Sequence, residues 1–197
     1  MKRVVGLFVL FLLVGTTLSA SKPDVDTITW QNEALWKCGR SISIRLFPIT
    51  GKFKGKLSKE EYIKMLAETL ASGLREKNIF ERVEILEQGK APTTDLVLEG
   101  EITTLTTGSR GTRFWIGFGA GKSKCEVSIR CLRVADSAQA FSVEHARIST
   151  EGLKSDEVQE NIEEVVDDVV GVLSLQKAGC NDPNLVTGTS EPAQPKT

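Results

Sequence analysis

The glycine-rich segment 110–123 contains the residues of this chain that most resemble a chemical motif. Gly121, Lys122 and Ser123 match the end of the phosphate-binding loop in which backbone amides and a lysine hold nucleotide phosphates. That loop also requires a glycine five residues before Gly121, and Ile116 stands there instead. It must further lead into a helix, whereas the residues after Ser123 alternate as in a strand. We therefore expect no nucleotide site and no cofactor.

The same segment combines large apolar side chains with basic flanks. The apolar residues are Phe114, Trp115, Ile116 and Phe118, interleaved with glycines at 117, 119 and 121. The basic residues are Arg110, Arg113, Lys122 and Lys124. An exposed apolar hairpin with a basic collar suits an acidic partner surface or anionic lipid headgroups. Alternatively, the aromatic side chains fold back over the sheet as core, with the glycines allowing bulges. The pattern alone leaves core packing, partner contact and lipid contact open.

Residues that could support catalysis are few. His145 is the one histidine, and it falls in the middle of an expected strand, where a structural role is more typical than that of a base. No serine stands in the context of a nucleophile elbow. Paired carboxylates occur late in the chain, where we expect them to face water with unperturbed acidity. We therefore predict that the protein is not an enzyme.

The four cysteines are compatible with export to an oxidising compartment. Cys125 and Cys131 share one strand face about 20 Å apart, too far to bond each other. No spacing resembles a zinc ligand set, so we expect no metal. The preferred disulfide joins Cys38 to Cys180, and the alternative is two bridges that each join a terminal cysteine to a strand cysteine. If Cys125 and Cys131 stay free, they act as small buried hydrophobes.

An acidic run without lysine or arginine extends from residue 156 to residue 168. It contains Asp156, Glu157, Glu160, Glu163, Glu164, Asp167 and Asp168, and the next basic residue is Lys177. Its first acids suit the positive end of a helix dipole. The ordinary interpretation is a solvated helix face. The sharper hypothesis is a docking site for a basic loop of a neighbouring copy.

These features must be positioned by strands and helices with a clear sequence pattern. Alternating apolar residues predict five strands, at 41–47, 81–87, 95–107, 123–134 and 141–149. Helical spacing predicts one helix opened by the capping box of Ser58 and Glu61, and a last helix that begins near Ser155. We expect an α/β (α+β) fold in the order β-α-β-β-β-β-α. Its single mixed sheet of about five strands is packed by two helices, on one face or split across both.

The ends of the chain differ from this domain, which we place at 41–180. Lys2 and Arg3 precede the apolar run Val4–Val14 and the small residues that end at Ala20, the pattern of a cleavable signal peptide over 1–20. The run is too short for a spanning helix, and no cysteine follows it for lipid attachment. Residues 21–40 are an extension without clear period, and 181–197 are Pro/Thr/Ser-rich and expected to be disordered. We expect the product in the periplasm or secreted, at most peripheral to the outer membrane.

Composition and charge favour an ordinary soluble domain. The chain has 197 residues, and its 40% hydrophobic and 26% charged content is that of a globular protein. A net charge of −1 gives no general attraction to nucleic acid, which we exclude as a partner.

Several of these segments together resemble a known family. They are Asp95–Ile102, Gly108 to Arg110, Arg113, the glycine-rich Gly117–Ser123, and the alternating strand that ends at Asp136. The sequence from about Ile42 to Val172 is similar to the bacterial domain-of-unknown-function family numbered forty-four ten. That resemblance implies an α/β domain like those of envelope lipoproteins, with a fold related to the curli-secretion lipoprotein and the N-terminal domain of the Tol translocation protein. It further implies association with the envelope, oligomerisation and no known catalysis. The lipid-attachment cysteine common among such relatives is absent here.

We therefore predict an exported envelope-associated module for binding or assembly. Its contact surface is the hairpin 110–124, and its partner is an envelope protein or a second copy of itself, with the membrane surface as a further possibility. The alternatives are a subunit of an outer-membrane pore or secretion-type assembly and, least favoured, an uncharacterised enzyme. A spanning strand needs about 9–11 residues of alternating pattern, which the hairpin lacks.

Overall fold

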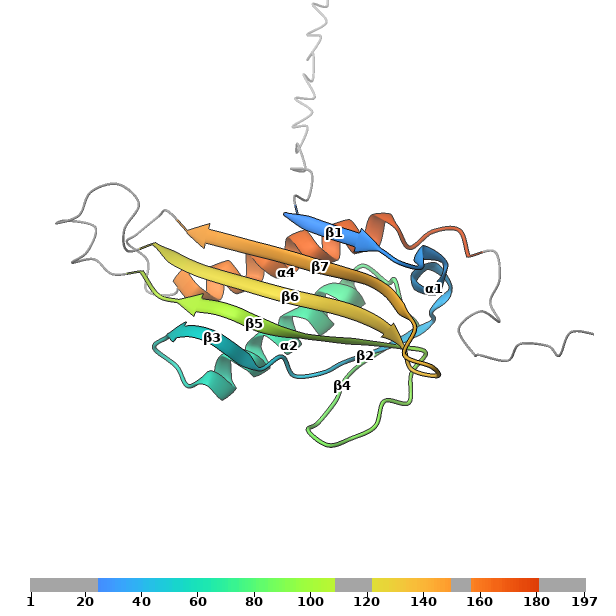
Figure 1. Ribbon diagram of the computed structural model, residues 1–197, viewed down its shortest axis with the longest axis horizontal. Helices are drawn as coiled ribbons and strands as arrows, with labels where there is room; N and C mark the ends of the chain where they lie inside the picture. The colour runs from blue at the N-terminus through green and yellow to red at the C-terminus, as the bar shows by residue number, and fades with distance from the viewer. Residues whose placement is uncertain (1–24, 109–121, 150–156, 181–197) are drawn as a thin grey trace, which may run out of the picture.

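A computed structural model describes residues 25–108, 122–149 and 157–180, and within these ranges the chain forms one mixed sheet and three helices (Figure 1). The strands are β1 (Thr27–Trp30), β2 (Ser41–Ile44), β3 (Ile49–Lys54), β4 (Arg82–Ile85), β5 (Leu96–Thr106), β6 (Ser123–Arg133) and β7 (Gln139–Ser149). The helices are α1 (Glu33–Cys38), α2 (Lys59–Glu76) and α4 (Glu157–Leu175). The strand order is β1-β7-β6-β5-β2-β4, and β3 pairs with β5.

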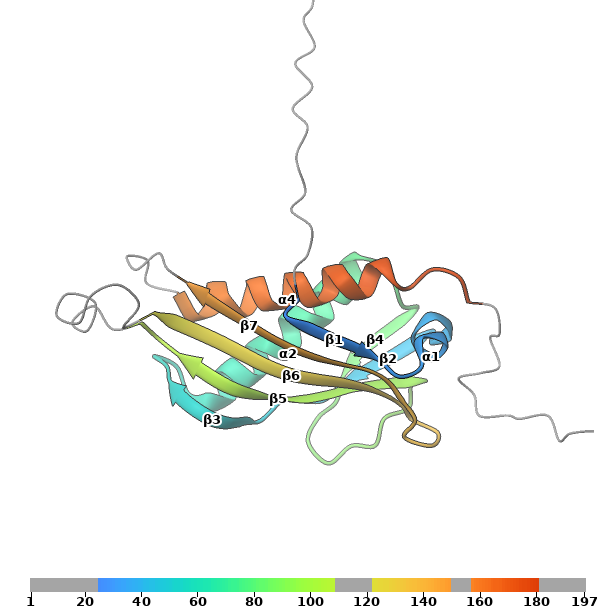
Figure 2. The same ribbon diagram turned by 45° about the horizontal axis from the view of Figure 1, so that its top comes forward.

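The sheet has one face covered by helices and one face open to solvent (Figure 2). α2 and α4 pack on the same face and against each other, where Gly73 lets Val170 approach closely. Burial alternates along β6: Cys125, Val127, Ile129 and Cys131 are at most 2% exposed on the covered face. The residues between them carry the polar side chains of the open face. An antiparallel sheet with this alternation can face water on one side.

The predicted class, one mixed sheet with helices, is confirmed, but the sheet has two more strands than the five predicted. The strand expected over 41–47 ends at Ile44, and β3 follows in a stretch where the sequence analysis predicted no strand. β5 is eleven residues long, so it extends beyond the end of β2. The first part of its edge pairs with β2, and the rest of the same edge pairs with β3. The strand pair is irregular at Gly51, where a Cβ atom would lie 1.9 Å from the Thr103 carbonyl oxygen.

The second addition lies in the N-terminal extension, where no regular structure was predicted. β1 pairs with β7, and the side chain of Asn32 then caps the first turn of the six-residue α1. Both elements are anchored by tryptophans: the Trp30 and Trp36 rings lie 5.1 and 5.2 Å from the Phe141 ring. Elements this short take their stability from tertiary packing, which leaves no periodic signal in the sequence.

The end of α4 is fastened to α1 by a disulfide and a half-buried lysine. Cys38 and Cys180 form the preferred bridge, and Cys125 and Cys131 are free and buried, so the alternative with two bridges is wrong. The Lys177 ammonium donates to the carbonyl oxygens of Trp36, at 2.7 Å, and Gly39. It also lies 3.8 Å from the centre of the Phe80 ring, a cation–π contact.

Lys177 is expected to make stability depend on pH. Burial lowers its pKa to about 8 from the ordinary 10.5, while the nearby Cys131 and Asp95 act in the opposite direction. Between pH 8 and 10.5 the folded protein therefore binds fewer protons here than the unfolded chain, so the free energy of unfolding should rise with pH in this window. Urea unfolding of wild type and Lys177→Met at pH 8, 9 and 10 measures the effect. The variant should lack this rise, and parallel pH profiles would contradict the assignment.

Candidate functional site

The segment predicted as the contact surface connects two neighbouring antiparallel strands. β5 and β6 pair from Leu96 opposite Arg133 to Thr106 opposite Lys124, so residues 109–121 join them at one end of the sheet. Six of the predicted contact residues lie outside the described ranges: Arg110, Arg113, Phe114, Trp115, Ile116 and Phe118. The other two, Lys122 and Lys124, are described and stand at the base of the connection. What the structure defines is therefore the surface from which this segment emerges.

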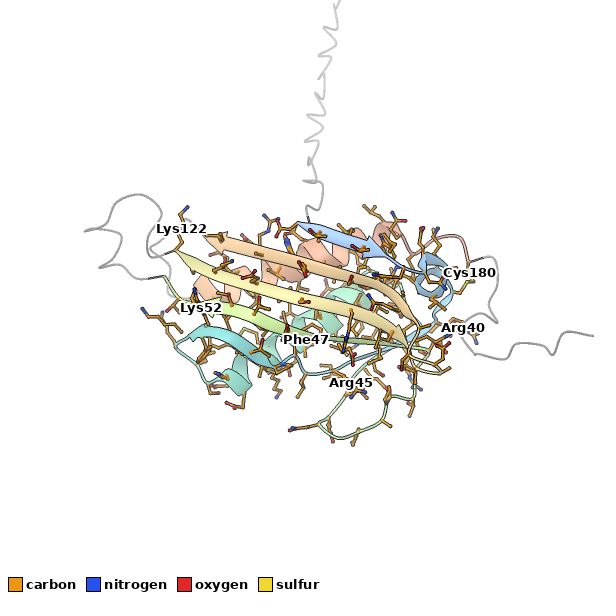
Figure 3. The ribbon with its side chains drawn as sticks, viewed as in Figure 1. Arg40, Arg45, Phe47, Lys52, Lys122 and Cys180 are labelled. Atoms are coloured by element: carbon orange, nitrogen blue, oxygen red, sulfur yellow. A yellow bond between two sulfur atoms is a disulfide. The ribbon has the colours of Figure 1, made fainter. Side chains whose placement is uncertain are left out.

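Strand register brings further residues to this end of the sheet. Lys54 of β3 is opposite Thr106 of β5, which is opposite Lys124 of β6, which is opposite Ile148 of β7. One row thus crosses four strands on the open face, because the alternate residues of β6 face the helices. Lys52 lies on the same face as Lys54, two residues earlier in β3. Phe53, which stands between these two lysines, points to the other face and contacts Tyr62 of α2. Figure 3 shows Lys52 and Lys122 at this end and Cys180 at the opposite end.

We call this surface the lysine end and define it by Lys52, Lys54, Lys122, Lys124 and Ile148. Lys124 is paired with Glu126 at 2.8 Å, and this contact is the main cause that lowers the pKa of Glu126. The remaining three lysines are exposed and form no ion pair with any residue that the structure describes. Ile148 is 50% exposed, a large apolar side chain among them. The lysine end therefore combines unpaired positive charge with apolar surface.

The centre of the open face is different, because its basic side chains are paired within the molecule, whereas Glu101 and Glu144, both opposite Ser128, form no ion pair with a described residue. One oxygen of Glu99 accepts from Arg130 at 2.8 Å, and the other lies 3.3 Å from Nε of Arg45. At the turn between β6 and β7, Arg133 pairs with Asp136, and this contact lowers the pKa of Asp136 to about 2. The unbalanced positive charge of this face is thus concentrated at the lysine end.

Lys52 and Lys54 are the site residues that the sequence analysis missed. No strand was predicted for their stretch, which follows Pro48 and contains Gly51 and Gly55. The signal that could have identified them is the alternation Lys52-Phe53-Lys54, in which one apolar residue between two lysines indicates a half-buried strand. Their place beside Lys124 also depends on β3 pairing with the far half of β5, which no local pattern indicates.

His145 is held between two carboxylates. Its Nε2 lies 3.0 Å from Oδ2 of Asp168 on α4, and its Nδ1 lies 3.2 Å from Oδ2 of Asp26, just before β1. Arg147 also donates to Asp168, so this acid is not exposed to water as predicted for the acidic run. His145 is 3% exposed, so a substrate could not reach its imidazole ring. The cluster joins the N-terminal segment, β7 and α4, a structural arrangement.

The other candidate chemical groups are buried or dispersed. Burial raises the pKa of the Cys125 thiol to about 12 and that of Cys131 further, so neither is a ready nucleophile. Within the described ranges, no group of three or more His, Cys, Asp or Glu side chains is placed to hold a metal ion. In the same ranges, no helix combines the length and apolar character needed to cross a membrane.

Comparison with known proteins gives one family and several similar structures. The model of the domain of unknown function DUF4410 matches residues 20–152, which confirms the resemblance identified from the sequence. The chain superposes on the subunit of a PelC dodecamer from Paraburkholderia phytofirmans with a TM-score of 0.54 and 13% identity, covering 75% of this chain and 96% of that chain. A variant PelC dodecamer from that organism gives a TM-score of 0.53 and 14% identity, with coverage of 75% and 98%.

A protein of the family DUF330 from Xanthomonas campestris is more distant, with a TM-score of 0.44, 12% identity and coverage of 70% of this chain and 83% of that chain. Comparison with curated protein sequences gives no match. At this identity the structural matches establish a shared fold, that of the PelC subunit, and nothing more specific.

Proposed function

The chain belongs to the family of the domain of unknown function DUF4410, and from this premise we propose that it is an exported, non-enzymatic module that binds an acidic protein surface at the bacterial cell envelope through its lysine end. The observation that carries the proposal is the row of strands β3, β5, β6 and β7, which presents Lys54, Lys124 and Ile148 together at the base of the 109–121 connection.

Two features support a place outside the cytoplasm. The N-terminal sequence has the charge, apolar run and small residues of an export signal. The Cys38–Cys180 disulfide joins residues 142 positions apart, and such structural bridges persist in oxidising compartments. Resemblance to families that include envelope lipoproteins agrees with this location, in the periplasm or at the periphery of the outer membrane.

The arrangement of charged groups favours binding over catalysis. The described histidine and the free thiols are buried, whereas Lys52, Lys54 and Lys122 are exposed and form no ion pair with a described residue. A lysine that forms no ion pair with the described residues is free to attract an acidic surface, which speeds encounter and selects the partner. The apolar residues of 110–118 then supply the area that a specific contact buries. The PelC neighbours are dodecamers, so a second copy of the chain is included among the possible partners.

Crosslinking in cells tests this proposal. A photo-reactive amino acid at position 115 should give crosslinks to protein, and the combined variant Lys52→Gln, Lys54→Gln, Lys122→Gln should lower their yield about tenfold, because each exposed charge pair contributes about 0.2–1 kcal/mol.

A matched variant serves as control: Lys64→Gln, Lys77→Gln, Lys90→Gln removes the same charge from exposed positions elsewhere and should leave the yield unchanged. Equal yields from the two variants would contradict the proposal. So would binding of the purified protein to anionic vesicles without any protein crosslink, because the lysine end would then serve a lipid surface.

A further inference from the structure

One surface of the molecule is strongly acidic, and within the described ranges no basic side chain is paired with it. Glu160, Glu163, Glu164 and Asp167 lie on one face of α4, at spacings of three, four and seven residues. We call them the acidic stripe. Three of them are exposed and Glu160 is half-buried, and no described lysine or arginine forms an ion pair with any of them. Asp168, on the inner side of the helix, is paired with Arg147 instead.

The acidic stripe carries an unrelieved repulsion. Glu160 and Glu164 are separated by four residues, as are Glu163 and Asp167, and like charges at this spacing destabilise a helix. α2 shows the contrary arrangement, in which Lys64 and Glu68 form an ion pair at the same spacing. Because Val158, Ile162 and Val165 are buried in the core, α4 holds the stripe in a fixed position. A cationic partner would relieve the repulsion.

Within the described ranges, the lysine end and the acidic stripe form no ion pair with each other, although Asn161 beside Glu160 donates to Ser123 beside Lys122. Lys52, Lys54 and Lys124 lie on the open face of the sheet, whereas α4 covers the other face beneath β6 and β7 (Figure 2). Their spacings nevertheless match. Lys54 and Lys124 are two strands apart, about 10 Å, and Glu160 and Asp167 are seven helical residues apart, also about 10 Å. The two surfaces are complementary in charge and length.

We propose that the acidic surface bound by the lysine end is the acidic stripe of a second copy of this chain, so that copies associate head to tail. The inference rests on the proposed function and names its partner. In each contact, the lysine end of one copy meets the acidic stripe of another, which makes the contact heterologous. Every pair of copies therefore keeps one lysine end and one acidic stripe free. Association therefore continues beyond a dimer, and it closes into a ring when the rotation per copy permits.

Exchange of the charges tests this contact. The first variant, Glu163→Lys, Glu164→Lys, Asp167→Lys, makes the stripe basic, and the second, Lys52→Glu, Lys54→Glu, Lys122→Glu, makes the lysine end acidic. Sedimentation of the processed protein at low salt should show oligomers for wild type, which dissociate as salt rises. Each variant alone should associate at least about tenfold more weakly. An equimolar mixture should recover association to within about threefold, because both contacts between unlike variants are then complementary.

The control changes the same charge elsewhere: Lys64→Glu, Lys77→Glu, Lys90→Glu should associate like wild type. Circular dichroism establishes that every variant is folded. A mixture of folded variants that stays monomeric overturns the inference. In cells, loss of the position-115 crosslink in the lysine variant but not in the stripe variant also overturns it, while the proposed function stands with another protein as partner. Retention of the crosslink in both variants overturns the proposed function itself.

Discussion

Replacement of both Cys38 and Cys180 with alanine is expected to lower the free energy of unfolding by about 3–5 kcal/mol. The disulfide closes a loop with a sequence separation of 142 residues, nearly the whole described chain, so its loss frees a large part of the unfolded ensemble. It also releases the end of α4, where Lys177 caps the carbonyl groups of Trp36 and Gly39. Denaturant unfolding followed by far-ultraviolet circular dichroism measures the change.

Reductant provides the control for this prediction, because it opens the bridge without altering the sequence. Dithiothreitol should destabilise wild type by a similar amount and leave the double alanine variant unchanged. Cys125 and Cys131 are buried on the covered face and are not expected to form a substitute bridge. A variant that unfolds at the same denaturant concentration as the oxidised wild type would show that the packing of α1 and α4 alone holds this end together.

The long elements of the fold could be predicted from the sequence because each carries its own periodic signal. α2 begins with the predicted capping box of Ser58 and Glu61, and burial alternates along most of β6. α4 spans Glu157–Leu175, close to the predicted start near Ser155. β1, α1 and β3 were missed: β1 and α1 lie in the extension 21–40, which shows no clear period, and β3 follows Pro48 and contains Gly51.

The candidate site shows the same division between local and non-local information. Lys122 and Lys124 were predicted because they adjoin the unusual segment 110–121 in the sequence. Lys52 and Lys54 reach the same place from about 70 residues earlier, through pairing of β3 with β5. Asp168 illustrates the converse: its sequence neighbours indicated a solvated acid, whereas His145 and Arg147 of β7 enclose it. The assembled sheet decides which residues of distant strands lie opposite each other. It also decides which side of a helix is covered.

Trp36→Ala is the second change with a large expected effect, a loss of about 3–5 kcal/mol in the free energy of unfolding. The Trp36 side chain is fully buried, and its Nε1 donates to the Leu173 carbonyl oxygen at 3.0 Å. Its ring contacts Phe80 and Phe141 edge to face, at 5.1 and 5.2 Å. Removal therefore leaves a cavity and an unpaired carbonyl group together, which are separate costs.

Trp30→Ala is the matched comparison, because Trp30 is half-buried and packs on the other side of Phe141 without a comparable hydrogen bond to α4. We expect it to cost at most about 2 kcal/mol. Trp36→Phe, which keeps a ring but lacks the N–H donor, should fall between them at about 1–3 kcal/mol. Equal losses from Trp36→Ala and Trp30→Ala would contradict the account. The N-terminal extension would then be held by the pairing of β1 with β7 rather than by Trp36, which joins α1 to α4.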